Sequence, residues 1–219
     1  MTSLTLVATD LDHTFLGADQ RPSELNTHSV FAAAEHGAAV VFATGRPLRW
    51  LDLLEVFTDV NPTVIASNGA VTYDLRNHRV ISDTPFPIDV ITDVVNDIAS
   101  ELPEAKFSLE EAQRCCVEPG FDRVDHGRPV THQGPIREFL TPDSRPVKML
   151  VRAFGIPTEE LFEIVDGLVD GRVSTTFSVQ LDDGLVELAP IGVSKGAALS
   201  ATAEQLGVDL ADAAAFGDM

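Results

Sequence analysis

Short apolar runs alternate with longer amphipathic stretches through the first part of the chain. Short runs bounded by polar or glycine-containing segments predict strands, and apolar residues recurring every three or four positions predict helices. The predicted order is strand Leu4–Thr9, helix Ser23–His36, strand Ala39–Ala43, helix Pro47–Phe57 and strand Thr63–Ala66. This alternation is typical of a parallel sheet built from strand–helix–strand units.

Small and polar residues mark the ends of these elements. Ser23 is placed to cap the N-terminus of the first helix, and Gly37 is placed to cap its C-terminus. Val71–Asp74 and Arg79–Ser82 flank a polar turn and predict a β-hairpin. The proline-containing segment 84–87 then interrupts the pattern, which indicates a linker to a second domain.

Beyond the linker the pattern is that of a compact α+β domain. Residues Ile88–Leu102 form an amphipathic helix, and a second helix is predicted to start at Pro157. Short strands are predicted at Lys106–Leu109, Arg114–Val117, Pro146–Arg152, Arg172–Val179 and Leu185–Leu188, with a loop over Pro119–Pro146. We therefore expect an α/β protein whose core, residues 1–83 and 190–219, receives an inserted α+β domain, residues 84–189.

The charge balance limits the partners of this chain. Lys and Arg number 15 against 34 Asp and Glu, a formal net charge of −19, whereas nucleic-acid binding needs a basic footprint. The N-terminus lacks the features of a signal peptide, and no apolar stretch approaches membrane-spanning length. Cys115 and Cys116 are adjacent and predict a strand with one thiol facing inward, not a disulfide framework. We expect a cytoplasmic protein that binds neither nucleic acid nor membrane.

The sequence Asp10-Leu11-Asp12-His13-Thr14 follows the first predicted strand, at the end where parallel sheets place their ligands. Alternation along a strand turns the two carboxylates to one side, where one can attack a substrate and the other can carry a proton. Both also suit Mg²⁺, which favours oxygen ligands. An EF-hand is rejected, because Phe15 and Arg21 occupy positions that need Gly and Glu. A turn with two solvated acids stays an alternative.

Three further segments carry chemistry in the same order along the chain. Thr44-Gly45-Arg46 follows the second predicted strand, and Ser194-Lys195 opens a helix predicted over Gly196–Leu206. Taken alone, Thr44 is explained as a cap and Lys195 as an exposed surface lysine. A lysine near a helix N-terminus is unusual, however, since the helix dipole favours anions there. The last segment is a short apolar run followed by Gly217-Asp218.

Together the four segments resemble the haloacid dehalogenase superfamily, and within it the Cof-type phosphatases with a type 2 (α+β) cap. The family pattern is DxDxT, then TGR, then a lysine in a GVSKG-like segment, then GDxxND. The turn 67–70 and the segment Val186–Pro190 are also similar to this family. The resemblance covers nearly the whole chain and implies a Rossmann-like core with an inserted cap.

The resemblance also implies a role for each matching residue. Asp10 is the nucleophile that becomes an aspartyl-phosphate, and Asp12 is the acid and then the base. Asp10, the main-chain carbonyl of Asp12, and Asp218 hold Mg²⁺. Thr44, Gly45 and Lys195 bind the phosphoryl group. Arg46 and Asn68 lie near the chemistry and are candidate substrate contacts, or they brace their own turns.

The chain departs from the family pattern at two places. His13 stands where the family has Gly, in a turn position whose unusual φ His tolerates. The fourth motif continues in the family with a second acid, but this sequence ends at Met219. We expect the strand Ala213–Phe216 to pair beside the Asp10 strand. We also expect weak Mg²⁺ binding, lower stability and self-association through the outer edge of that strand.

The function indicated is a Mg²⁺-dependent phosphomonoester hydrolase that acts on a small phosphorylated metabolite, such as a sugar phosphate or a cofactor phosphate. The alternative is a non-catalytic protein that binds a phosphorylated ligand and lacks a complete metal site. A phosphomutase is disfavoured, because residues 15–22 are too few for a cap after the first motif. Polar cap residues that suit a substrate, or a solvated loop, are Arg114, Arg123, His126, Arg128 and His132.

Overall fold

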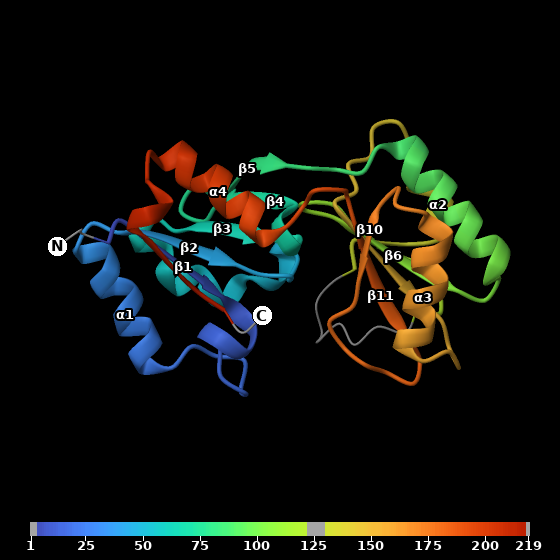
Figure 1. Cartoon of the computed structure of the whole chain (residues 1–219), viewed down its shortest axis with the longest axis horizontal. Coiled ribbons are helices and arrows are strands. Elements are labelled where there is room, and N and C mark those ends of the chain that lie inside the picture. The colour runs from blue at the N-terminus through green and yellow to red at the C-terminus, as the bar shows by residue number, and fades with distance from the viewer. Residues whose placement is uncertain (1–3, 122–129, 218–219) are drawn as a thin grey trace. The chain divides into compact units, whose positions relative to one another are not determined.

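The computed structural model describes residues 4–121 and 130–217. The chain divides into two compact units, residues 1–83 with 193–219 and residues 84–192 (Figure 1). Each unit contains one six-stranded sheet. Because the first unit is made from two separate parts of the chain, the second unit is an insertion within it.

The first unit is built on a sheet whose central strands are parallel. Its strand order is β12 (Ala213–Phe216), β1 (Leu6–Asp10), β2 (Ala39–Ala43), β3 (Thr63–Ala66), β4 (Val71–Asp74) and β5 (Arg79–Asp83). Strands β12, β1, β2 and β3 pair in parallel, and β4 and β5 add the expected antiparallel hairpin. The predicted fold class is confirmed, as is the pairing of β12 beside β1. Self-association through β12 stays a prediction.

Helices cover both faces of this sheet, as expected for parallel strands. In Figure 1, α1 (Glu24–Glu35) lies on one side, and α4 (Lys195–Leu206) lies on the other. Side chains of β2 alternate between the two faces. Val41 packs with Ala203 of α4, whereas Phe42 points into an aromatic cluster on the opposite face. The rings of that cluster, Phe15, Phe31, Phe42 and Phe57, have centroids 5.2 to 5.8 Å apart.

The helix predicted over Pro47–Phe57 is wrong. The structure has two 3₁₀ helices instead, η2 (Leu48–Trp50) and η3 (Asp52–Val60). The apolar residues Leu51, Leu54 and Phe57 are spaced by three, and all are buried. A 3₁₀ helix repeats every three residues and stacks such a set on one face, so the spacing fits it as well as it fits an α-helix.

The end signals of the long helices are confirmed. The Ser23 hydroxyl accepts a hydrogen bond of 3.0 Å from the N–H of Asn26, which caps α1. At the other end the chain leaves α1 through His36, followed by Gly37 with φ 84°. The Ser194 hydroxyl accepts a bond of 3.0 Å from the N–H of Ala197 and caps α4 in the same way. Both caps were visible in the sequence because capping is local.

The second unit is the α+β structure that the sequence predicts. Helices α2 (Ile88–Glu101) and α3 (Thr158–Val169) pack against one face of its sheet. The strand order is β10 (Ser174–Thr176), β11 (Leu185–Ala189), β9 (Lys148–Arg152), β6 (Lys106–Glu110), β7 (Cys115–Val117) and β8 (His132–Gln133). The pairs are antiparallel except for β7 with β8. Strand β10 is shorter than the strand predicted over Arg172–Val179, and the predicted loop 119–146 includes β8 and the short helix η5 (Ile136–Glu138).

Both cysteines of this unit are buried, which corrects the expectation that one of them faces inward. Cys116 packs among the residues under α2 and α3, and Cys115 packs with Val117 and Phe121 on the opposite face of the sheet. Adjacent strand residues face opposite sides, so both are buried because both faces are covered here. Burial raises the pKa of the Cys116 thiol to about 11. The thiol therefore stays protonated and unreactive near neutral pH.

The first unit also contains the irregular turn η1 (Leu11–Phe15) and the short helices η4 (Ser67–Gly69) and η6 (Leu210–Asp212). Within residues 4–121 and 130–217, we find no helix whose length and apolar character would let it cross a membrane.

The aromatic cluster gives a test of the fold. Phe57 is fully buried, whereas its neighbour Val56 is 56% exposed. Replacement of Phe57 by Ala should lower the free energy of unfolding by about 3–5 kcal/mol, because it removes a buried ring and leaves a cavity. Val56→Ala is the control and should change it by less than about 0.5 kcal/mol. Denaturant unfolding of both variants measures this. Equal effects would contradict the position of η3 against the sheet.

Candidate active site

The carboxylate of Asp10 stands at the C-terminal end of β1 and has two partners among the described residues. Its Oδ1 accepts a hydrogen bond of 2.9 Å from the N–H of Leu11, and its Oδ2 lies 3.2 Å from Nζ of Lys195. The Asp10 side chain is 13% exposed, so this ion pair is only partly screened by water. Two residues far apart in sequence thus meet where the resemblance expects a nucleophile and a phosphate-binding lysine.

Strand β1 ends at Asp10, so a turn, and not strand alternation, positions Asp12. In this turn Asp12 is extended and His13 has φ 58°. The left-handed backbone at His13 confirms that this residue occupies a position where unusual φ is required. Leu11 and Phe15 are buried and anchor the two ends of the turn in the core. The side chain of Asp12 is left 37% exposed at the edge of the sheet.

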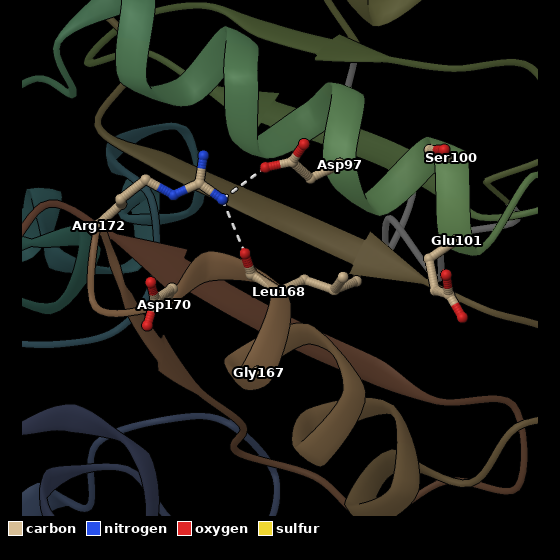
Figure 2. A pocket seen from close by; sticks show the side chains of 7 residues that line it. All are labelled: Asp97, Ser100, Glu101, Gly167, Leu168, Asp170 and Arg172. Carbon is tan, nitrogen blue, oxygen red and sulfur yellow. Dashed lines mark hydrogen bonds and ion pairs between the residues drawn. The ribbon is translucent and has the colours of Figure 1, made fainter.

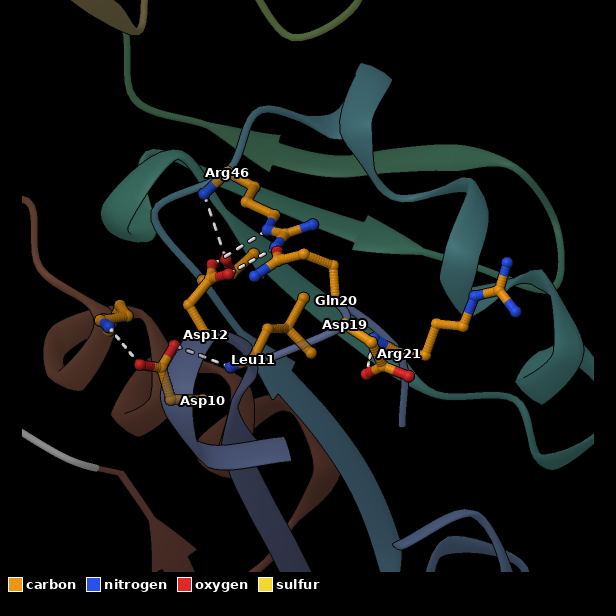
Figure 3. A network of polar contacts seen from close by, with 9 residues as sticks. Asp10, Leu11, Asp12, Asp19, Gln20, Arg21 and Arg46 are labelled. Carbon is orange, nitrogen blue, oxygen red and sulfur yellow. Dashed lines mark hydrogen bonds and ion pairs between the residues drawn. The ribbon is translucent and has the colours of Figure 1, made fainter. Parts of the chain in front are cut away.

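Arg46 holds the carboxylate of Asp12 (Figure 3). Its Nε donates a hydrogen bond of 2.9 Å to Oδ2 of Asp12, and its Nη2 donates to Oδ1 of the same carboxylate. The same Nη2 also donates to Oε1 of Gln20. Sequence reasoning named Arg46 as a candidate substrate contact and did not single out Gln20. No local pattern marks Gln20, because it is linked to the site through Arg46, a residue in another loop.

Thr44 is buried and ties the turn after β2 to the turn after β3. Its Oγ1 accepts a hydrogen bond of 3.1 Å from the N–H of Arg46, and its carbonyl accepts one of 3.0 Å from the N–H of Asn68. The carbonyl of Arg46 accepts a further bond of 2.9 Å from the N–H of Ser67. These bonds fix the two turns side by side at the end of the sheet where Asp10 lies.

Gly45 allows this close approach. A Cβ atom on Gly45 would lie 2.7 Å from Oδ1 of Asn68, closer than such atoms pack. The side chain of Asn68 therefore lies directly against the Thr44–Arg46 turn. Asn68 itself has φ 58°, a conformation that Asn tolerates better than most residues.

A second glycine lets helix α4 approach the same place. Gly69 has φ 107°, and a Cβ on it would lie 2.3 Å from the carbonyl oxygen of Ser194. Because Lys195 is the first residue of α4, this backbone contact sets its position next to the sheet edge. The anion that explains a lysine near a helix N-terminus is, in this structure, the carboxylate of Asp10.

The donors at this site fit Mg²⁺ in kind. The carboxylate of Asp10 and the carbonyl of Asp12 are the hard oxygen ligands that this ion prefers. Among the residues that the structure describes, no three His, Cys, Asp or Glu side chains form a metal-binding group. The third expected ligand, Asp218, lies outside the described residues. The described residue before it, Gly217, runs beside Asp10: a Cβ built on Gly217 would be 3.9 Å from the Asp10 Cβ.

The polar residues considered in the second unit have ordinary structural surroundings where they are described. The Nη2 of Arg114 lies 2.5 Å from Oε2 of Glu111 on the surface, and the exposed His132 ring lies 5.7 Å from that of Phe139. Arg123, His126 and Arg128 lie outside the described residues.

The second unit also has a surface pocket of about 490 Å³. It is lined by Asp97, Ser100, Glu101, Gly167, Leu168, Asp170 and Arg172 (Figure 2). Arg172 donates from Nη2 to Asp97 at 2.6 Å and to the carbonyl of Leu168 at 2.7 Å. The lining therefore holds three acids around one arginine that is already paired. A phosphorylated ligand would be repelled there, so this pocket does not compete with the β1 site.

Comparison with known proteins identifies the family. The sequence model of haloacid dehalogenase-like hydrolases matches residues 7–219. The match spans nearly the whole chain, so this protein belongs to the haloacid dehalogenase-like hydrolase family. The resemblance drawn from the four sequence segments is confirmed, and the chain is a hydrolase of this family.

Individual relatives agree with this assignment. An HMP-PP phosphatase of Serratia proteamaculans (strain 568) is 27% identical over 229 residues, which cover 97% of this chain and 77% of the relative. The solved structure of the sugar phosphatase BT4131 is similar with a TM-score of 0.78 at 16% identity, over 96% of this chain and 79% of that one. A haloacid dehalogenase-like hydrolase from Bacteroides thetaiotaomicron gives a TM-score of 0.80 at 17% identity, over 97% and 81%. The structural matches confirm the fold.

The contact between Gly69 and Ser194 gives a test of how the site is assembled. Gly69→Ala should clash with the Ser194 backbone and move Lys195 away from Asp10. Gly37→Ala is the matched control, because Gly37 also has positive φ but a Cβ there would meet no described atom within 4 Å. We expect Gly69→Ala to cost about 1–3 kcal/mol more than the control, the usual penalty of overpacking. Thermal melting compares the two. Equal melting temperatures would refute this close approach.

Proposed function

We propose that this chain is a Mg²⁺-dependent phosphomonoester hydrolase that acts through an aspartyl-phosphate on Asp10. The observation that carries the proposal is the approach of Lys195 Nζ to within 3.2 Å of Asp10 Oδ2. A nucleophilic carboxylate that attacks a phosphate group meets electrostatic repulsion, so it needs a cation at this distance. The phosphatase names of the Serratia relative and of the BT4131 structure support the same reaction class.

In the first step an oxygen of Asp10 attacks phosphorus, and the bond from phosphorus to the substrate oxygen breaks. Asp12, protonated at this stage, gives its proton to that oxygen, so an alcohol leaves and the phosphoryl group stays on Asp10. Lys195 stabilises the negative charge on the equatorial phosphoryl oxygens. Phosphoryl transfer depends mainly on such positioning and charge stabilisation. When bound, Mg²⁺ would supply further positive charge at Asp10, Asp12 and Asp218.

In the second step a water molecule attacks phosphorus, and the bond to the Asp10 oxygen breaks. Asp12 is now a carboxylate and accepts a proton from the water, so inorganic phosphate leaves and both carboxyl groups return to their starting states. One residue therefore acts as acid and then as base. The turn after β1 suits this double role, because it leaves the Asp12 side chain 37% exposed and accessible to both alcohol and water.

The remaining sequence candidates are assigned to binding the phosphoryl group and the substrate. The Thr44 hydroxyl oxygen accepts a hydrogen bond from the N–H of Arg46. The hydroxyl proton is therefore directed toward another acceptor, such as a phosphoryl oxygen. Because Gly45 has no side chain, the Thr44–Arg46 turn lies close to Asn68, which stands at the edge of the site. We infer a small phosphorylated metabolite as substrate, either a sugar phosphate or a cofactor phosphate, with its selection assigned to residues 84–192. We also place the protein in the cytoplasm, where the free thiols Cys115 and Cys116 would persist.

Metal dependence is the first test of this function. With p-nitrophenyl phosphate, the purified chain should release phosphate in the presence of Mg²⁺. EDTA should abolish turnover, and excess Mg²⁺ should restore it, since the ion offsets charge in the attack. Full activity in EDTA would eliminate the metal from the mechanism. Binding of phosphate without any turnover, with or without Mg²⁺, would favour a non-catalytic binding protein.

The two carboxylates of the turn give the second test. Asp10→Asn should leave less than a few per cent of the rate, because an amide is a poor nucleophile. Asp12→Asn should lower the rate by about 10²–10⁴, the usual contribution of general acid–base catalysis. The control is Asp59→Asn, at an exposed position of η3. Steady-state kinetics compares the three variants. The nucleophile assignment fails if Asp10→Asn stays active, and the acid–base assignment fails if Asp12→Asn matches the control.

A further inference from the structure

We propose that Gln20 is a positioning residue for this reaction: by holding Arg46, it fixes the orientation in which Asp12 transfers its proton. The inference rests on the proposed hydrolase function. It concerns a residue that neither the sequence pattern nor the reaction scheme above uses. Figure 3 shows the three side chains converging from the β1 turn, the following loop and the turn after β2.

The contact of Arg46 with Asp12 determines the plane of the carboxylate. Nε and Nη2 donate to the two separate oxygens of Asp12, which is the parallel fork that arginine makes with carboxylates. A paired fork restrains rotation of the carboxylate, whereas a single bond would not. The direction in which Asp12 presents its proton is therefore set by the position of the guanidinium group.

Arg46 needs a support of its own to act in this way. A long arginine side chain loses conformational entropy when it is fixed in one position. Its Nη2 is shared between Oδ1 of Asp12 and Oε1 of Gln20, so Gln20 gives the guanidinium a second acceptor beside the carboxylate. The amide oxygen of Gln20 supports the guanidinium as a hydrogen-bond acceptor, and a carboxylate oxygen in the same position would do so too.

The loop that carries Gln20 is built to present this side chain. The N–H of Gln20 donates to the carbonyl of Gly17 at 2.9 Å, and the N–H of Gly17 donates to the carbonyl of Arg21 at 2.9 Å. The carboxylate of Asp19 accepts from the N–H of Arg21 at 3.2 Å. Gln20 itself has φ 61°, a left-handed conformation that is unfavourable for a residue with a side chain. The loop is thus closed by its own hydrogen bonds, with Gln20 held in a left-handed position.

This arrangement makes a specific kinetic prediction. Proton donation by Asp12 matters most when the leaving alcohol is a poor leaving group, as in an alkyl phosphate. It matters little for p-nitrophenyl phosphate, whose phenolate leaves readily. The ratio kcat/KM reports steps up to the first irreversible one, so it isolates transfer to Asp10 from the later hydrolysis. Loss of the Gln20 contact should therefore lower kcat/KM selectively for the alkyl substrate.

The experiment compares Gln20→Leu, Gln20→Gly and Gln20→Glu with the wild-type chain and with Arg21→Met. Leu removes the acceptor at similar size, Gly removes it and relaxes the positive φ, and Glu retains an acceptor for Arg46. Arg21 is the matched control, since its exposed side chain lies in the same loop and points away from Arg46 (Figure 3). The substrates are glycerol 1-phosphate and p-nitrophenyl phosphate with Mg²⁺, and thermal melting verifies folding.

For Gln20→Leu and Gln20→Gly we expect kcat/KM to fall about tenfold for glycerol 1-phosphate, part of the usual 10²–10⁴ for an acid–base group. For p-nitrophenyl phosphate the fall in kcat/KM should be less than about threefold. Where kcat/KM falls, kcat should decrease and KM should stay unchanged. Gln20→Glu and Arg21→Met should keep the wild-type ratio between substrates. Equal falls on both substrates, or Gln20 variants that match Arg21→Met, would overturn the proposal.

A second measurement does not depend on activity. The NMR signal of the Arg46 Nε–H group, assigned by its loss in Arg46→Lys, should be sharp in the wild-type chain and in Gln20→Glu. It should broaden in Gln20→Leu, because the guanidinium then loses one of the acceptors that hold it. An unchanged signal in Gln20→Leu would refute the support of Arg46 by Gln20. A wild-type chain that hydrolyses neither substrate would overturn the hydrolase function and this inference together, whereas an active chain with an unchanged ratio in Gln20→Leu overturns the inference alone.

Discussion

The close approach of the Gly69 backbone to the carbonyl of Ser194 is the constraint on which the site depends. The first unit is assembled from chain segments on either side of an inserted unit, and they must meet with little tolerance. A glycine without a side chain lets helix α4 begin where Lys195 reaches Asp10. Parallel pairing of β12 with β1 brings the same returning segment to the other side of the Asp10 strand. Both contacts use backbone geometry, so the fold itself positions the lysine.

The charges at the site are arranged in two pairs with different geometry. Lys195 is a compact point charge beside Asp10, whereas Arg46 is a planar fork bound to both oxygens of Asp12. A nucleophile needs a nearby cation that can also face the incoming phosphoryl oxygens, and lysine suits this because it imposes no plane. A group that transfers a proton needs a fixed direction, which arginine provides. This local positive charge is needed in a chain with a formal net charge of −19, whose overall field repels anionic ligands.

The rest of the first unit provides rigidity where the site needs it. The aromatic cluster under β2 and the aliphatic packing under α4 hold the sheet from both faces, so that the turns at its edge have fixed starting points. Hydrogen bonds from Ser67 and Asn68 to the Thr44–Arg46 turn then join the ends of β2 and β3. The second unit has its own core between α2, α3 and its mostly antiparallel sheet. In its polar pocket, Arg172 is already paired with Asp97, which also lines the pocket.

Elements whose signals are local could be predicted from the sequence alone. Short apolar runs predicted β1 to β5, and the hydroxyls of Ser23 and Ser194 marked the starts of α1 and α4, because a cap needs only residues three positions away. The ordered motifs named Asp10, Asp12, Thr44 and Lys195 and led to the family. Periodicity failed over 47–57, where spacing by three fits two kinds of helix. The contacts of Arg46 with Asp12 and Gln20, and of Gly69 with Ser194, were seen only in the folded structure. Each of these contacts joins separate loops, and no local pattern encodes which loops the sheet brings together.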